Sequence, residues 1–157
     1  MSDALLSING LTLRRGNAAV LDEVSLTLLK GRTLGLVGES GAGKSTLAMA
    51  IIGLLMAPEV QLSGSMLYQG QQLVGLSDKR FSQLRGKKIG LIFQDATTSL
   101  DPCFTIGEQI MEPLRRHLGL RRDEAIERAV ELLDSVGIPD ARSRLSAYPH
   151  QLSGGMQ

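Results

Sequence analysis

The sequence of 157 residues contains one cysteine, no tryptophan, and only three Phe and two Tyr. Cys103 has no partner for an internal disulfide, so a reducing compartment fits the composition best. So few aromatic rings argue against a protein that stacks single-stranded bases. The net charge of +1 argues neither for nor against a nucleic-acid partner.

Long apolar runs are also missing. No stretch reaches the roughly 18 apolar residues of a membrane-spanning helix. The first residues include Asp3 and lack the basic flank and apolar core of a secretory signal. With 43% hydrophobic and 21% charged residues, the chain resembles an ordinary globular domain with its own core.

Residues 38–45 match the phosphate-binding pattern Gly-x4-Gly-Lys-Ser/Thr. Gly38, Gly41 and Gly43 allow the backbone to approach a ligand closely, so that loop N–H groups converge on phosphate oxygens. Lys44 would bring a positive charge to the β- and γ-phosphates, and Ser45 a hydroxyl to Mg²⁺. The alternative is a glycine-rich turn that binds no ligand.

The residues around this loop supply the context that it requires. Residues 33–37 form a short apolar run with β-branched ends and predict a buried parallel strand. A helix is predicted after the loop from the spacing of Leu47, Ile51, Leu54 and Leu55. The positive end of its dipole would face the bound anion.

The rest of the first 94 residues mixes strands with a short helix. Residues 4–13 and 20–29 alternate apolar with polar side chains around the turn signal Gly16-Asn17, which predicts antiparallel strands. A further sheet segment is expected at 64–73 with a turn at Gly70, a helix at 78–85 and a buried strand at 89–93.

The pattern changes near residue 95, where we place a boundary between parts 1–94 and 95–157. A polar loop, 95–104, precedes helical segments that begin at Thr105. The clearest helix covers about 122–136, where Glu124 and Arg128 have the spacing of an i,i+4 ion pair. It ends before Gly137 and Pro139.

A second motif occupies residues 152–157, Leu-Ser-Gly-Gly-Met-Gln. Ser-Gly-Gly alone is most simply a flexible turn. Ser153 could also cap a helix whose first backbone N–H groups bind an anion.

These motifs together resemble the nucleotide-binding subunit of an ATP-binding cassette (ABC) transporter. Residues 38–45 resemble its Walker A loop, Phe93-Gln94 its glutamine loop, and residues 152–157 its signature sequence. The resemblance covers essentially the whole chain. Several short segments are similar to the peptide and nickel importer branch of the family. These segments are 37–40, 92–95, 98–102, 105–109 and 148–155.

The resemblance implies an α/β fold, a P-loop NTPase of ABC type. It would have an antiparallel β subdomain, a partial RecA-like core sheet and a helical subdomain. The residues implied to bind ATP are Gly38, Glu39, Ser40, Gly41, Ala42, Gly43, Lys44, Ser45 and Thr46. Ser45 and Gln94 would serve Mg²⁺, and the signature residues Ser153, Gly154, Gly155 and Gln157 would face the ATP of a partner.

The implied function is that of an ATPase subunit powering an importer of peptides, nickel or a similar small solute. It would act at the cytoplasmic face of the plasma membrane, as a head-to-tail dimer with a second ATPase subunit. Transmembrane permease subunits would dock on the helical subdomain, and an extracytoplasmic solute-binding protein would be an indirect partner. The alternatives are a nucleotide-binding module without hydrolysis and an ABC ATPase acting on nucleic acid. The importer-like segments argue against an ATPase that acts on nucleic acid, so no nucleic-acid partner is expected.

The sequence departs from the family in two respects. The first hairpin has no aromatic residue to stack on adenine, and Arg14 or Arg15 stands near that position. In the family, the Walker B strand, catalytic glutamate and switch histidine all lie downstream of the signature, and none of them is found in this sequence. No residue of this sequence is therefore assigned as catalytic base, and His117 and His150 cannot be the switch histidine by order.

Overall fold

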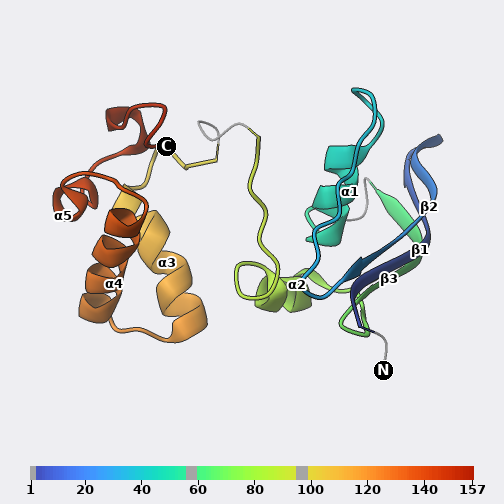
Figure 1. The fold of residues 1–157 in the computed structure, drawn as a ribbon, viewed down its shortest axis with the longest axis horizontal. Helices are drawn as coiled ribbons and strands as arrows, with labels where there is room; N and C mark the ends of the chain where they lie inside the picture. The colour runs from blue at the N-terminus through green and yellow to red at the C-terminus, as the bar shows by residue number, and fades with distance from the viewer. Residues whose placement is uncertain (1–2, 56–59, 95–98) are drawn as a thin grey trace. The chain divides into compact units, whose positions relative to one another are not determined.

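The computed structural model describes residues 3–55, 60–94 and 99–157. It divides into two compact units, Met1–Leu91 and Ile92–Gln157, which are described separately below (Figure 1). Among the described residues, no helix is both long enough and apolar enough to cross a membrane.

The first unit is built on an antiparallel sheet with the strand order β2-β1-β3-β4. Its strands are β1 (Ala4–Arg15), β2 (Ala18–Leu29), β3 (Gln61–Tyr68) and β4 (Gln71–Gln72). The first hairpin turns at Gly16-Asn17 and the last at Gln69-Gly70. The antiparallel strands predicted from alternating side chains are thus confirmed, and in this hairpin Leu11, Leu13 and Leu21 are buried while Arg14 and Asp22 are exposed.

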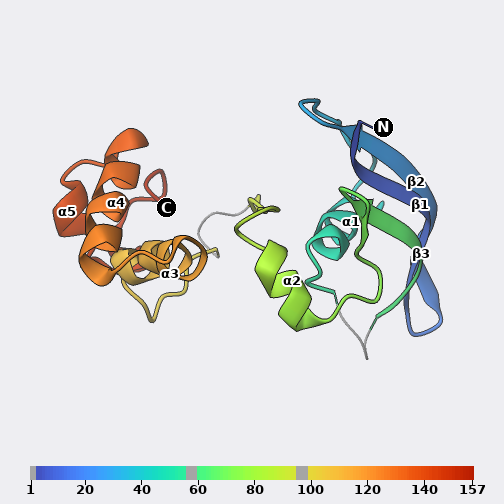
Figure 2. The same ribbon diagram turned by 90° about the horizontal axis from the view of Figure 1, so that it is seen from below.

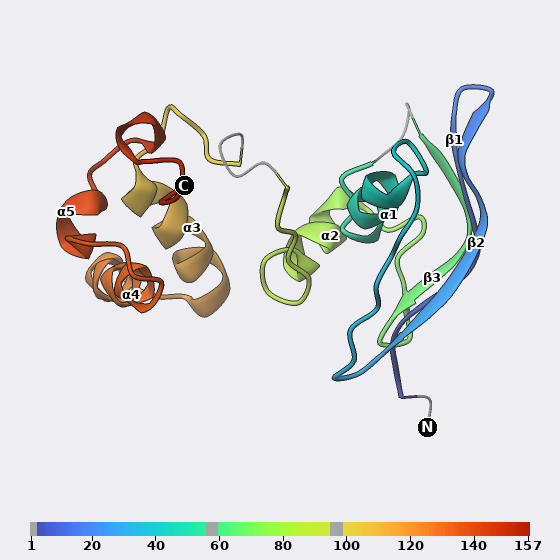
Figure 3. The same cartoon turned by 45° about the horizontal axis from the view of Figure 1, so that its top comes forward.

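Two helices cover one face of this sheet (Figures 2 and 3). They are α1 (Lys44–Ile51) and α2 (Asp78–Leu84). Leu47 and Ala50 of α1 and Phe81 of α2 join the sheet residues in one hydrophobic core, whose most completely buried side chains are Leu11, Leu13, Met66 and Leu73. Burial of one such side chain contributes about 1.5–3 kcal/mol, so this core fixes α1 against the sheet.

Two predictions for the first 94 residues are wrong. Residues 33–37 and 89–93 are not strands. Within the described residues, the second segment makes one isolated β-bridge, between Ile89 and Arg85. A strand needs a neighbour for its backbone N–H and C=O groups, and no described strand pairs with these segments. Several of their apolar side chains are accordingly exposed, among them Val37 by 93% and Ile92 by 97%.

The second unit is helical. Its elements are α3 (Ile106–Leu118), α4 (Arg122–Ser135), the short α5 (Ala141–Arg144) and the 3-10 turn η1 (Pro149–Gln151). Two clusters hold it together, one around Ile106, Leu133 and Ala141 and one around Leu114, Ala125 and Ala129. The helix predicted at 122–136 is confirmed by α4.

The ion pair predicted between Glu124 and Arg128 does not form. Glu124 instead accepts a hydrogen bond from the Arg121 backbone N–H (2.8 Å) and pairs with its guanidinium (3.0 Å), while Arg128 pairs with Glu131 (2.6 Å). The first N–H groups of a helix lack partners within the helix. The Glu124 carboxylate therefore turns back to the start of α4 instead of reaching Arg128 in the next turn.

Candidate functional site

The phosphate-loop motif lies directly before α1. Gly43 is the N-cap of α1 with a left-handed φ of 84°, and Gly41 has φ 85°. The first N–H groups of a helix have no partner inside the helix, and the first turn of α1 contains no acidic residue. This end of α1 therefore presents unneutralised donors and a positive dipole end to an anion.

Lys44 folds back over the loop that precedes it. Its Nζ donates to the carbonyl oxygens of Gly38 (2.8 Å) and Glu39 (2.7 Å). An ammonium group has three N–H donors, so one donor remains for a ligand. The loop thus fixes its only lysine charge beside the N–H groups of α1.

The β1–β2 hairpin packs against the same loop. A Cβ atom at Gly43 would lie 2.7 Å from Cδ2 of Leu21 and 3.0 Å from the carbonyl oxygen of Val20. Glycine is required at residue 43 both for its φ and for this close approach. Sequence reasoning did not assign Val20 and Leu21 to the site, because in sequence they are simply alternating residues of a strand.

The remaining loop residues leave the site open to solvent. Glu39, Ser40, Gly41, Ala42 and Ser45 are exposed, and Thr46 is half-buried. The donor set consists of one ammonium group, backbone N–H groups and the three hydroxyls of Ser40, Ser45 and Thr46. That set fits a polyphosphate with a hard cation, because Mg²⁺ takes oxygen ligands and keeps most of its waters.

Arg14 and Arg15 lie at the end of β1, opposite Ala19 and Ala18 of β2, and both are exposed. The hairpin that carries them is the one whose Leu21 contacts Gly43. Both guanidinium groups therefore belong to the strand pair that borders the phosphate loop.

The other predicted site residues belong to the second unit. Gln94 is exposed, and the residues that follow it, 95–98, lie outside the described residues. Ser153, Gly154 and Gly155 are exposed too, and the carbonyl of Ser153 accepts hydrogen bonds from the backbone N–H groups of Met156 (2.9 Å) and Gln157 (3.1 Å).

The signature loop is anchored on both sides. Leu152 packs against the cluster around Ile106 and Leu133. The Gln157 side-chain amide donates to the carbonyl of Pro149 at 2.6 Å, and Tyr148 donates its backbone N–H to the side chain of Gln151 at 2.8 Å. Ser153 and the two glycines are therefore the exposed tip of an otherwise fixed turn.

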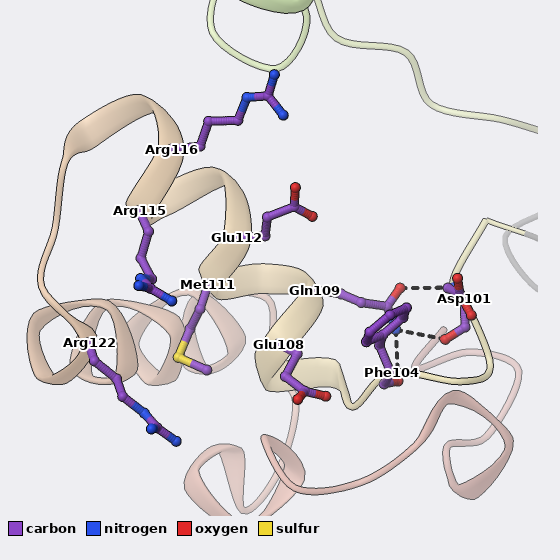
Figure 4. Close-up of a pocket in the computed structure, with 9 residues that line it drawn as sticks. All are labelled: Asp101, Phe104, Glu108, Gln109, Met111, Glu112, Arg115, Arg116 and Arg122. Carbon is purple, nitrogen blue, oxygen red and sulfur yellow. Dashed lines mark hydrogen bonds between the residues drawn. The ribbon is translucent and has the colours of Figure 1, made fainter.

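A hollow of about 1100 Å³ lies along α3 in the second unit (Figure 4). Its lining combines both charge signs with apolar side chains, from Asp101, Phe104, Glu108, Gln109, Met111, Glu112, Arg115, Arg116 and Arg122. Gln109 holds the loop before α3, because its amide group donates to the carbonyls of Asp101 (2.9 Å) and Phe104 (3.0 Å) and accepts the Asp101 N–H (2.9 Å). Phe104 is 52% exposed.

A capping box at the start of α3 perturbs one acid of this hollow. Glu108 accepts hydrogen bonds from the Thr105 backbone N–H and hydroxyl, both 2.9 Å, and Thr105 Oγ1 accepts the Glu108 N–H at 3.2 Å. The backbone hydrogen bond from Thr105 is the main cause that lowers the pKa of Glu108 below its usual range, and the charge of Arg122 adds to it.

Residues 21–157 match the family model described as "ABC transporter". The dipeptide transport ATP-binding protein DppD of Escherichia coli is 43% identical over 157 residues, covering 98% of this chain and 48% of DppD. The oligopeptide transport ATP-binding protein OppD of Salmonella typhimurium is 41% identical over 160 residues, covering 99% of this chain and 48% of OppD. The chain thus spans about half the length of these curated relatives.

Among solved structures, a dimeric post-hydrolysis state of the ATP-binding cassette MJ0796, bound to ADP and Pi, superposes with a TM-score of 0.79 at 26% identity. That match covers 96% of this chain and 64% of the other. The family model's match, residues 21–157, extends across the phosphate loop and the signature residues.

Proposed function

The chain belongs to the ABC transporter family, and on that premise we propose that it is the nucleotide-binding part of an ATPase subunit that powers an importer. The observation that carries the proposal is the phosphate loop. Lys44 is held over the loop by two carbonyls, at an end of α1 that has a left-handed glycine cap and no acid in its first turn. This arrangement suits the triphosphate of ATP.

Each loop residue then has a role toward Mg-ATP. Lys44 would bind the β- and γ-phosphates, Thr46 the α-phosphate, and the hydroxyl of Ser45 would be a ligand of Mg²⁺. Bound Mg²⁺ neutralises phosphate charge during phosphoryl transfer. Gln94 would respond to the metal and the attacking water. No residue of this chain is proposed as the catalytic base.

The signature turn serves a second nucleotide in this proposal. The exposed Ser153 and Gly155 would contact the γ-phosphate bound by a partner subunit, in a head-to-tail dimer. Support comes from the fixed turn that presents these residues. The dimeric state of MJ0796 is consistent with such an assembly.

The proposed solute is a peptide, since the similar proteins DppD and OppD carry dipeptide and oligopeptide transport in their names. Nickel or a similar small solute is the alternative within the same branch. Permease subunits would hold the ATPase at the cytoplasmic face of the membrane. The helical unit would dock on them, and the exposed Phe104 beside mixed charges is the surface suited to that contact.

Lys44→Ala tests the proposal. In the full-length protein, the variant should lose Mg-ATP binding in a titration with a fluorescent ATP analogue, while its circular dichroism stays unchanged. Lys30→Ala, an exposed lysine after β2, is the matched charge control. ATP binding that persists in Lys44→Ala would exclude the site.

Hydrolysis distinguishes the second candidate function, a nucleotide-binding module without turnover. The full-length protein, reconstituted with its permease subunits, should release phosphate from ATP, and Lys44→Ala should abolish the release. Binding that depends on Lys44, without any phosphate release, would favour the binding module.

A further inference from the structure

The C-terminal end of α1 closes in a left-handed turn at Gly53. The Gly53 N–H donates to the carbonyl of Ala50 (3.0 Å) and the Leu54 N–H to that of Met49 (2.9 Å), while Gly53 has φ 68°. This pattern is a Schellman motif. It satisfies the carbonyls of Met49 and Ala50, whereas the carbonyls of Ile52 and Gly53 accept from a side chain.

Arg85 supplies those donors. Its Nε donates to the carbonyl of Ile52 (2.8 Å) and its Nη2 to that of Gly53 (2.5 Å), across more than 30 positions of sequence. Its Nη1 pairs with Asp78 at 2.8 Å, and the guanidinium carbon lies 5.5 Å from the ring centre of Phe81. The side chain of Arg85 is only 27% exposed.

This contact is rigid for three reasons. The guanidinium is a planar fork, so two carbonyls and a carboxylate define its orientation. The carbonyl end of a helix carries partial negative charge, which favours a cation there. The backbone of Arg85 is itself fixed, because its N–H donates to the carbonyl of Phe81 (2.9 Å) and it forms a β-bridge with Ile89.

Phe81 confines the same helix end from another side. A Cβ atom at Gly53 would come within 2.5 Å of Cδ2 of Phe81, so ring and backbone are in direct contact. Arg85, Phe81 and Asp78 therefore join the end of α1 to α2 as one unit, which we call the α1 clasp.

We propose that Arg85 is a positioning residue for the nucleotide site. This inference rests on the proposed nucleotide-binding function. An isolated helix of eight residues is not stable in water, so the position of α1 depends on its tertiary contacts. Leu21 confines the first end of α1 at Gly43, and the α1 clasp confines the last. Together they set where Lys44 and the first-turn N–H groups meet the phosphates.

The test compares Mg-ATP affinity in folded variants of the full-length protein. Arg85→Met keeps the apolar stem and removes the donors, and Arg85→Lys keeps the charge without the fork. Arg80→Met, at an exposed arginine of α2, the helix whose C-cap is Arg85, is the matched control. The dissociation constant is measured well below the melting temperature of each variant, with circular dichroism to establish that it is folded.

We expect Arg85→Met to raise the dissociation constant about tenfold, the equivalent of about one well-aligned hydrogen bond. Arg85→Lys should give an intermediate value, and Arg80→Met should match the unmodified protein. A folded Arg85→Met with unchanged affinity, even with a lower melting temperature, would reduce Arg85 to a stabilising role and overturn the proposal.

A second variant keeps the test decisive if Arg85→Met does not fold. Asp78→Asn removes only the carboxylate partner of Arg85 and should raise the dissociation constant in the same direction by a smaller factor; unchanged affinity there overturns the proposal as well. Failure of the proposed function looks different, because then the unmodified protein binds no Mg-ATP or binds it equally after Lys44→Ala.

Discussion

Gly43 and Leu21 are in contact across 22 positions of sequence: a Cβ at residue 43 would lie 2.7 Å from Cδ2 of Leu21. The contact joins the N-cap of the phosphate helix to the first hairpin. Leu21 is buried in the core, with 5% exposure, and has little room to withdraw. The position of the phosphate loop is therefore set by a strand residue as well as by the glycines of the loop.

Gly43→Ala should consequently weaken Mg-ATP binding by more than backbone strain alone explains. The left-handed conformation costs a non-glycine residue about 1–2 kcal/mol, and the contact with Leu21 adds to it. The control is Gly70→Ala in the β3–β4 turn, which has φ 81° and open space around its Cβ position. Thermal melts and nucleotide titrations of both variants make the comparison. Equal losses of stability, with Mg-ATP affinity retained in Gly43→Ala, would contradict it.

The capping box of α3 predicts a pH dependence of the helical unit. The hydrogen bonds from Thr105 lower the pKa of Glu108 below its ordinary value of 4.5. Because the folded-state pKa lies below the unfolded one, the carboxylate stabilises the fold at pH values above 4.5. That contribution disappears as the pH falls through the lower, folded-state pKa.

Glu108→Gln should therefore flatten the acid side of the stability profile. A glutamine can still accept the Thr105 N–H but does not titrate. Urea melts followed by circular dichroism between about pH 7 and pH 3 measure the effect. Glu112→Gln, an exposed residue of the same helix outside the capping box, is the control. The assignment is refuted if Glu108→Gln loses stability with acid as steeply as the unmodified protein.

Local periodicity was sufficient to predict several elements. β1 and β2 follow from alternation, and α4 from its apolar stripe, because each buries one face whatever its neighbours are. The phosphate loop could be located because glycine and lysine at fixed spacing serve one chemistry. What remains a prediction is the ligand itself and the roles of Gln94 and the signature residues.

Pairing could not be predicted from the same information. The apolar runs at 33–37 and 89–93 indicate surface that can be buried, but a strand exists only with a partner, and the described residues provide none. Glu124 could pair with Arg121 or with Arg128. It pairs with Arg121, because the same carboxylate also accepts the Arg121 N–H at the start of α4. The contact of Leu21 with Gly43 has no local signal, because it depends on how the hairpin folds over the loop.

The same hairpin leads to a prediction about the base of the nucleotide. Arg14 and Arg15 are exposed on the strand pair that borders the phosphate loop, and the hairpin has no aromatic ring. A guanidinium can stack on adenine with its planar face, as it does on aromatic side chains. If one of the two arginines does so, it contributes about 0.5–1 kcal/mol at an exposed site, or roughly two- to fivefold in affinity.

Arg14→Ala and Arg15→Ala should therefore be titrated with both Mg-ATP and Mg-tripolyphosphate, with the exposed Arg32→Ala as control. Stacking predicts that one variant binds Mg-ATP more weakly while its affinity for tripolyphosphate is unchanged, because tripolyphosphate has no base. A parallel loss for both ligands would mean that the arginine acts only through its charge. Unchanged Mg-ATP affinity in both variants would leave the two guanidinium groups as solvated charges on an edge hairpin.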